Sequence, residues 1–289
     1  MSRLAAWLEN GSVITDGAWG TELQARGLGP GECPDFWNQE HPERVEEVAQ
    51  SYVAAGSQII LTNTFRANAL VLGPEHVMEI NRTGVEISKR AAGHKARVVA
   101  SIGPSGKMLM AGEVTAEELL AVFRTQALAL SEGGADALVV ETMSDIEEAR
   151  LAVEAAKETG LPVIASFAFD SGKNKDRTMM GATPERVAAA MAEAGADAVG
   201  ANCGAGPAHF VDVCRRLKAA SGLPVWVKPN AGLPVMKEGR ATYEMPPEEF
   251  ASFLPALLDA GASFIGGCCG TTPDYIRALT VQRASCATS

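Results

Sequence analysis

The sequence predicts a single (β/α)8 TIM barrel over residues 1–289, and three observations support this fold class. A helix end followed by Gly, a small residue and an apolar run recurs at Gly56, Gly134, Gly195 and Gly261. The separations of 78, 61 and 66 residues are about twice a βα unit of roughly 30 residues. Eight apolar runs of strand length alternate with helical patterns, and their near-continuous hydrophobicity is typical of parallel strands buried on both faces.

The order of elements follows from these runs. The eight expected strands are 13–17, 59–64, 98–103, 137–142, 163–169, 198–203, 225–230 and 264–268. The clearest helical patterns cover 42–55, 115–132, 145–159, 184–194 and 247–260, and several begin with a capping residue before Pro or an acid. Two connections, 18–42 and 231–246, are long for βα loops, so we expect them to cover a substrate. The tail 282–289 is expected to fray.

A doubly wound open sheet is the alternative architecture, but no G-x-G-x-x-G motif follows the first strand. The net charge of −10 argues against nucleic acid or an anionic membrane as a partner, because both require a basic surface. No apolar run reaches the roughly 18 residues of a membrane-spanning helix, and Glu9 interrupts the apolar N-terminal stretch, so no signal peptide is expected. We therefore expect a cytoplasmic protein with reduced cysteines.

Polar residues occupy the carboxyl ends of the expected strands, where barrel enzymes build their active sites. They are Asp16-Gly17, Asn63, Ser101, Glu141, Cys203, Lys228-Pro229-Asn230 and Cys268-Cys269. Cys203 and the Cys268-Cys269 pair lie at the ends of two expected strands that are close to each other around the barrel. Adjacent strand residues face opposite ways, so both members of the pair converge only if the flanking glycines allow an irregular backbone.

Three convergent thiolates with an open fourth position are typical of a catalytic zinc site, and soft ligands favour zinc over magnesium or calcium. The competing interpretation is that each cysteine is a small core residue. We retain that interpretation for Cys33, Cys214 and Cys286, which lack such a context. The four histidines lie in expected helices or loops and are assigned no ligand role: His41, His76, His94 and His209.

Asp16 and Glu141 are acids at the ends of buried strands. Each is either a solvated or capping residue, or one of a pair that binds an ammonium group. Gly17 would let the backbone approach a ligand closely, and Glu141 follows the apolar run ALVV, where a carboxylate is poorly solvated.

Several sequence motifs resemble those of a known family. These are D-G-A-W-G-T-E-L, T-N-T-F, G-A-N-C-G and G-G-C-C-G-T-T-P, which resemble the zinc-dependent homocysteine S-methyltransferases over essentially the whole chain. The phrases A-S-I-G-P-S-G-K, E-T-M-S-D-I-E-E-A and K-P-N-A-G-L-P look most similar to the homocysteine module of cobalamin-dependent methionine synthase. The resemblance implies methyl transfer to homocysteine to form methionine.

The resemblance also implies the roles of individual residues. Zn²⁺ would sit on Cys203, Cys268 and Cys269, which are then the catalytic set. Asp16 and Glu141 would hold the homocysteine amino group. The carboxylate would lie near backbone at Gly17 and 101–103, with Asn63 as a further substrate contact. A separate hypothesis rests on position alone: Asn230, at the end of the seventh strand and near the eighth, would offer its amide oxygen to zinc before substrate arrives.

The methyl donor is left open between a separate methylated corrinoid protein, S-methylmethionine, a betaine and a sulfonium. The chain ends at Ser289, so the folate and cobalamin modules of methionine synthase are not expected on it. Arg66 follows Phe65 where betaine-dependent relatives carry tyrosine, which argues against an aromatic pocket for a quaternary ammonium there. The alternatives are a methyltransferase for another thiol, and a non-catalytic thiol- or metal-binding barrel.

Overall fold

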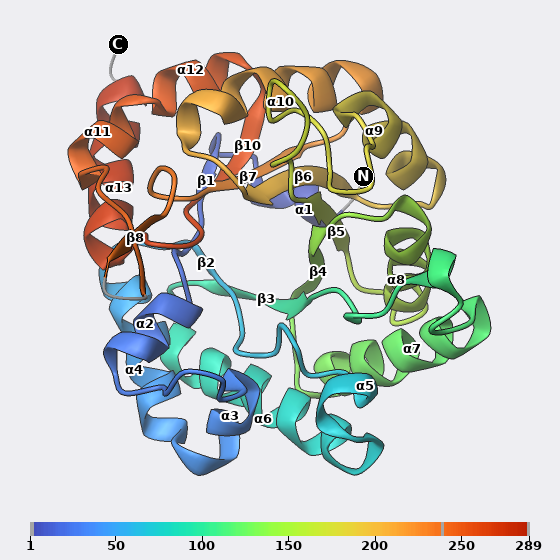
Figure 1. The fold of residues 1–289 in the computed structure, drawn as a ribbon. Helices are drawn as coiled ribbons and strands as arrows, with labels where there is room; N and C mark the ends of the chain where they lie inside the picture. The colour runs from blue at the N-terminus through green and yellow to red at the C-terminus, as the bar shows by residue number, and fades with distance from the viewer. Residues whose placement is uncertain (1–2, 238–239, 288–289) are drawn as a thin grey trace.

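A computed structural model describes residues 3–237 and 240–287, and it places eight parallel strands in one ring (Figure 1). Around the ring the order is β1, β10, β7, β6, β5, β4, β3 and β2. A hydrogen bond from the Gln58 amide to the Ile14 carbonyl (2.8 Å) joins the two edge strands and closes the barrel. The strands are β1 Val13–Ile14, β2 Ile59–Ile60, β3 Arg97–Ile102, β4 Ala137–Met143, β5 Val163–Phe167, β6 Ala198–Cys203, β7 Val225–Pro229 and β10 Ala262–Ile265. The predicted fold class is confirmed.

Helices surround the strands and face them with apolar residues. They are α1 Arg3–Trp7, α2 Gly20–Ala25, α3 Trp37–Glu40, α4 Pro42–Ala54, α5 Ala69–Leu72, α6 Pro74–Ala92, α7 Ala116–Glu132, α8 Ile146–Lys157, α9 Pro184–Glu193, α10 Pro207–Ser221, α11 Pro247–Ser252, α12 Leu254–Asp259 and α13 Pro273–Ala287. Thr115 and Glu118 form a capping box at α7, and the Thr183 side chain caps α9. These caps explain why α7 and α9 begin within one residue of the predicted positions.

Three expectations about elements need correction. The pattern over 247–260 is two helices rather than one, because Pro255 cannot donate within a helix interior and the chain restarts as α12. The tail is helical through Ala287: the Arg283 guanidinium donates to Gln58 Oε1 (3.1 Å) and to the Asn10 carbonyl (3.1 Å). The expectation of fraying was therefore wrong for 282–287, and 288–289 lie outside the described residues.

The third correction concerns β1 and β2, which have two residues each instead of five or six. The Leu61 amide donates to the Asp16 carboxylate (2.7 Å) rather than to a strand partner, so backbone pairing ends there. The long connections are also structured. Residues 18–42 hold α2, α3 and the 3₁₀ helix η1 Pro34–Phe36, and 231–246 hold the hairpin β8 Val235–Lys237 with β9 Arg240–Thr242.

The barrel interior changes character along its axis. Side chains two positions apart on a strand face the same way. At the amino end they form an apolar cluster into which α1 inserts Leu4, and the Arg97 guanidinium lies over the Trp7 ring (4.9 Å). Two residues further along three strands the inward residue is polar: Val99 then Ser101, Val139 then Glu141, and Trp226 then Lys228. Among the described residues, no helix is both long and apolar enough to cross a bilayer.

Candidate functional site

Three cysteines meet at the carboxyl end of the barrel. Cys203 ends β6, whereas Cys268 and Cys269 follow β10 in a loop. Their Sγ atoms all lie within 4.8 Å of one another, and Cys203 Sγ is 4.0 Å from Cys269 Sγ. Sulfurs at 2.3 Å from a tetrahedral zinc would be separated by about 3.8 Å, so the cluster is close to the spacing that a metal requires. The three cysteines form a candidate metal site.

An irregular backbone brings the thiols together. Cys203 has φ +63°, in the left-handed region that a side chain rarely adopts, and Gly204 continues at +67°. After β10, Gly270 has φ +81°. Gly266 is needed for close approach instead, because a Cβ there would collide with Thr15 and the Asp16 carbonyl. The flanking glycines therefore serve two purposes: Gly270 allows a left-handed turn, and Gly266 allows two backbone segments to approach closely.

Hydrogen bonding among the three thiols shifts their pKa values in opposite directions. Hydrogen bonds with Cys268 and Cys269, aided by the Gly204 backbone and Asn230, lower the pKa of Cys203 to about 3. The bond to Cys203, together with burial, raises the pKa of Cys269 to about 11, and the pKa of Cys268 also rises. The cluster thus favours one shared thiolate without a metal. A cation would take the place of the two remaining protons.

Asn230 lies beside this cluster, one residue past β7. Its amide nitrogen donates to the Gly204 carbonyl (2.8 Å), while its Oδ1 is buried and finds no hydrogen-bond partner among the described residues. A buried amide oxygen without a partner is costly, and it has the chemistry of a hard fourth ligand. The three sulfurs therefore fit a soft metal ion, and the Asn230 amide lies beside them.

A cavity of about 310 Å³ opens beside the cysteines. Its aromatic wall is formed by Trp19 and Phe65, and its floor by Glu141 and Lys228. The predicted residues Gly17, Asn63 and Ser101 also line it, as do all three cysteines. This volume accommodates a small amino-acid-sized molecule.

Glu141 is the acid that the cavity exposes. It is 8% accessible, and Ser101 Oγ donates to its Oε1 (2.5 Å). Burial raises the pKa of Glu141, while the charge of Lys228 and the Ser101 hydroxyl oppose that rise. The next residue, Thr142, has φ +60°, a strained value for a β-branched residue. A carboxylate held in this way is suited to receive a cation.

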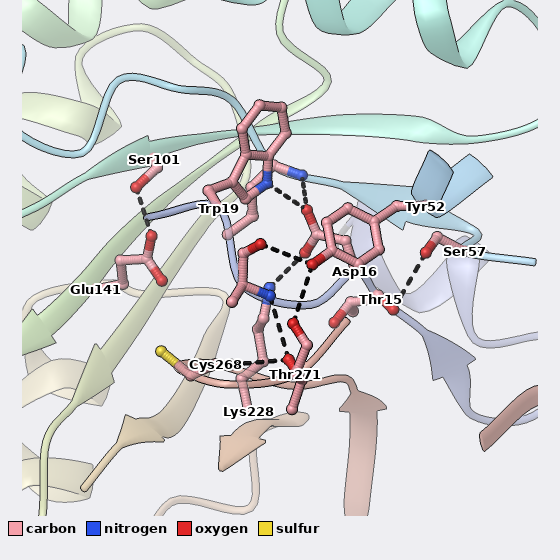
Figure 2. A network of polar contacts seen from close by, with 12 residues as sticks. Thr15, Asp16, Trp19, Tyr52, Ser57, Ser101, Glu141, Lys228, Cys268 and Thr271 are labelled. Atoms are coloured by element: carbon pink, nitrogen blue, oxygen red, sulfur yellow. Dashed lines mark hydrogen bonds and ion pairs between the residues drawn. The ribbon is translucent and has the colours of Figure 1, made fainter. Parts of the chain in front are cut away.

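Asp16 lies behind the cavity and is fully buried (Figure 2). Its Oδ2 accepts hydrogen bonds from the Leu61 amide (2.7 Å) and Trp19 Nε1 (2.7 Å), and its Oδ1 pairs with the Lys228 ammonium. The carboxylate therefore orients one aromatic wall of the cavity and one cation in its floor.

Two further predicted residues owe their positions to neighbouring loops. Asn63 donates to the Pro34 carbonyl (2.7 Å) and to Asn38 Oδ1 (3.0 Å). Gly17 packs under Tyr52, because a Cβ there would lie 2.7 Å from the Tyr52 hydroxyl. That hydroxyl donates to the Ala18 carbonyl (2.6 Å), which fixes the loop after β1.

Sequence reasoning missed Trp19 and Tyr243 as site residues, and it placed Lys228 at a strand end without giving it a role. The signal for Lys228 was its position two residues after the inward-facing Trp226, on the same face of β7. Tyr243 is distant in sequence, but it hydrogen-bonds with Cys269, and its ring covers Gly270. Burial and the nearby cysteines raise the pKa of the Tyr243 hydroxyl. No local pattern in the sequence marked it.

Comparison with known proteins agrees with this geometry. The family model described as homocysteine S-methyltransferase matches residues 13–282. Methionine synthase of Mycobacterium leprae (strain TN) is 32% identical over 95% of the chain, and that of Mycobacterium tuberculosis is 31% identical over 94%. The chain spans about a quarter of the length of these relatives, 24% and 25%.

Solved structures extend the comparison. The metallated form of the homocysteine methyltransferase MmuM from Escherichia coli superposes with a TM-score of 0.80 at 27% identity, covering 96% of this chain and 99% of that one. Pyruvate carboxylase of Rhizobium etli, at 13% identity and a TM-score of 0.58, shares the fold alone; the match covers 98% of this chain and 28% of that one. The barrel, its cysteine cluster and these matches show that the chain belongs to the homocysteine S-methyltransferase family.

Proposed function

We propose that this protein transfers a methyl group to the thiol of homocysteine and so forms methionine. The observation that carries the proposal is the cysteine cluster, which opens onto an amino-acid-sized cavity with an acid and a cation in its floor. Family membership supplies the substrate class. The alternatives, another small thiol or a non-catalytic thiol- or metal-binding barrel, share the cluster, but a thiol without an amino group and a carboxylate would make no use of the paired charges.

We assign Zn²⁺ to Cys203, Cys268 and Cys269, which would hold it through their sulfurs, and the Oδ1 of Asn230 would be a further oxygen ligand. Sulfur ligands and a spacing close to tetrahedral support this choice. When bound, zinc supplies the charge that keeps a coordinating thiol deprotonated at neutral pH. The three cysteine thiolates offset that charge and leave the substrate sulfur nucleophilic.

The chain's own residues position the substrate. Glu141 faces the cavity and accepts the substrate ammonium, and buried Asp16 adds negative charge from behind. Backbone at Gly17 and at 101–103 borders the position proposed for the carboxylate, and Asn63 shapes the wall. The thiol proton leaves to solvent, the sulfur lone pair bonds to the methyl carbon, and the leaving group departs with the electron pair of the broken bond.

The donor approaches from the open end of the barrel. Among the described residues, exposed apolar side chains gather on the loops after β3, β5 and β7: Met108, Met110, Met179, Met180, Leu233 and Met236. Such a rim favours a donor carried on a separate protein, as with a methylated corrinoid, over a small polar donor such as S-methylmethionine. The thiolate chemistry requires reduced cysteines, which is the state that the cytoplasm maintains.

A donor assay tests the function. Zinc-loaded protein is incubated with homocysteine and, in separate reactions, a methylated corrinoid protein, S-methylmethionine, a betaine or a sulfonium, and methionine is followed. We expect methionine from at least one donor. Homocysteine binding without methionine from any of them would identify a non-catalytic barrel. Methylation of another thiol in preference to homocysteine would reassign the substrate.

A further inference from the structure

Lys228 is a buried cation that the proposed mechanism has not used. It is the fourth residue of β7, is 2% accessible and lines the floor of the cavity. Lysine is almost never this buried without a partner that offsets the cost of desolvation. Asp16 supplies one such partner, and the face of the Trp226 ring lies 5.7 Å from Nζ. A purely structural role would be complete at this point.

The ammonium nevertheless has donors to spare. A lysine ammonium carries three N–H groups, and among the described residues Asp16 is its hydrogen-bond acceptor. Figure 2 shows the side chain rising from β7 toward Asp16, with Glu141 on its other side. The remaining N–H groups therefore lie where the cavity and Glu141 meet.

Two backbone donors near the proposed carboxylate position, at Ser101 and Gly103, are occupied. The Ser101 amide donates to Thr62 Oγ1 (3.1 Å), and the Gly103 amide donates to the Phe65 carbonyl (2.8 Å). A carboxylate that enters the cavity would need a donor that is not already engaged. Lys228 has spare donors and a full positive charge, and charge-assisted hydrogen bonds are the stronger kind.

We propose that Lys228 binds the carboxylate of the thiol substrate, with Asp16 holding its ammonium in place. The floor of the cavity then presents a cation and an anion, Lys228 and Glu141, to a substrate that carries both charges on one carbon. This inference rests on the proposed function, because it assumes an amino-acid thiol. It makes Lys228 a residue that determines specificity among thiols.

The test measures binding, not turnover. Zinc-loaded protein is titrated by calorimetry with homocysteine, with 3-aminopropane-1-thiol, which lacks the carboxylate, and with 4-sulfanylbutanoate, which lacks the amino group. We expect Lys228→Met to weaken homocysteine binding by roughly 10- to 100-fold, the worth of a charged hydrogen bond, and to change 3-aminopropane-1-thiol binding by less than about twofold. Lys89→Met is the matched control, since Lys89 pairs with Asp136 at the other end of the barrel (3.0 Å).

A second pair of variants removes the risk that Lys228→Met leaves Asp16 buried and uncompensated. Asp16→Asn and the double variant Asp16→Asn/Lys228→Met both lack that charge, and they differ only in the lysine. The readout is the ratio of the dissociation constants of 3-aminopropane-1-thiol and homocysteine, which we expect to fall about tenfold or more in the double variant. An unchanged ratio, or equal weakening of both probes, would overturn the proposal.

The outcomes separate the two proposals. Carboxylate-dependent binding that is lost with Lys228, but no methionine from any donor, would support this inference and defeat the proposed function. Methionine formation with an unchanged carboxylate preference in the variants would do the reverse. Binding of 4-sulfanylbutanoate as tight as that of homocysteine, lost with Lys228, would keep the role of the lysine and remove that of Glu141.

Discussion

The two ends of the barrel interior use the same eight strands for opposite purposes. At the amino end, Trp226 and Phe264 pack against each other (5.7 Å between ring centroids), and Leu4 of α1 closes the bottom. At the carboxyl end the same strands or their following loops present Glu141, Lys228 and three thiols to a cavity. Buried apolar area stabilises the first end, while the second holds desolvated charges that cost stability.

Backbone strain follows the same division. Among the described residues, the non-glycine residues with positive φ are Thr142, Lys175 and Cys203, and all three lie at strand ends or loops of the carboxyl end. Strain of this kind persists only where surrounding structure enforces it. The apolar end therefore fixes the fold, and the polar end depends on that rigidity to hold its strained backbone and buried charges in place.

The largest effect is expected from Cys268→Ala. Loss of one of three sulfur ligands should remove zinc and reduce turnover below detection, since even residues one shell further out contribute 10- to 100-fold. Zinc content by elemental analysis and methionine formation are the measurements. Cys286→Ala, on α13, is the control that should keep one equivalent of zinc. Full zinc occupancy in the Cys268 variant would refute the assignment of the metal site.

Phe264→Ala, at the amino end, should lower stability while leaving zinc binding and turnover intact. The ring is fully buried against Trp226, so its loss should lower the free energy of unfolding by about 3–5 kcal/mol. Urea denaturation measures this change. The folded fraction should still bind one zinc and turn over, because the cavity lies one layer above. Zinc lost in proportion to stability would show that the two ends are coupled.

Asp35 should make stability depend on pH at the carboxyl end. Burial raises its pKa to about 6, so the protonated form is favoured in the folded state. The stabilising contribution is present below pH 4 and is lost as pH rises through 6, by up to about 3 kcal/mol. The stability of Asp35→Asn relative to the natural protein should therefore rise from pH 4 to 7, as measured by chemical denaturation.

Glu185 provides the contrast for Asp35, because its pKa is lowered rather than raised. Arg216 lowers the pKa of Glu185 to about 2, so a Glu185→Gln difference should be present above pH 4.5 and shrink only as pH falls toward 2. This pair is largely solvent-exposed, and its effect should be small. Parallel pH profiles for the two variants would contradict the assignment of the Asp35 effect to burial.

The smallest effect is expected from Tyr243→Phe. Its hydroxyl hydrogen-bonds with Cys269, and removing one such bond next to a metal ligand should weaken zinc binding by about tenfold. Competition with a chromophoric chelator measures this. The fold should be unaffected, because the ring that covers Gly270 remains. Unchanged zinc affinity would place Tyr243 outside the metal site.

The barrel and the cysteine set could be predicted from the amino-acid sequence alone. Near-continuous apolar runs such as ALVV before Glu141 are typical of parallel strands buried on both faces, and the glycine motif repeats with the βα period. The position of Cys203 at a strand end, and that of Cys268-Cys269 in the loop after the last strand, followed from that period. These are properties of local pattern, which the linear sequence carries in full.

The pairing of the charges at the site could not be predicted from the sequence, because it depends on contacts between distant strands. Asp16 and Lys228 are 212 residues apart, yet they form one buried pair, and Tyr243 reaches Cys269 from a hairpin loop that the strand pattern does not predict. The arginine that ties α13 to Gln58 lies in a tail without periodicity. Such contacts depend on where closure of the ring places each strand end. The two acids are of similar chemistry, and their surroundings at those strand ends decide that Glu141 faces the cavity while Asp16 holds a cation.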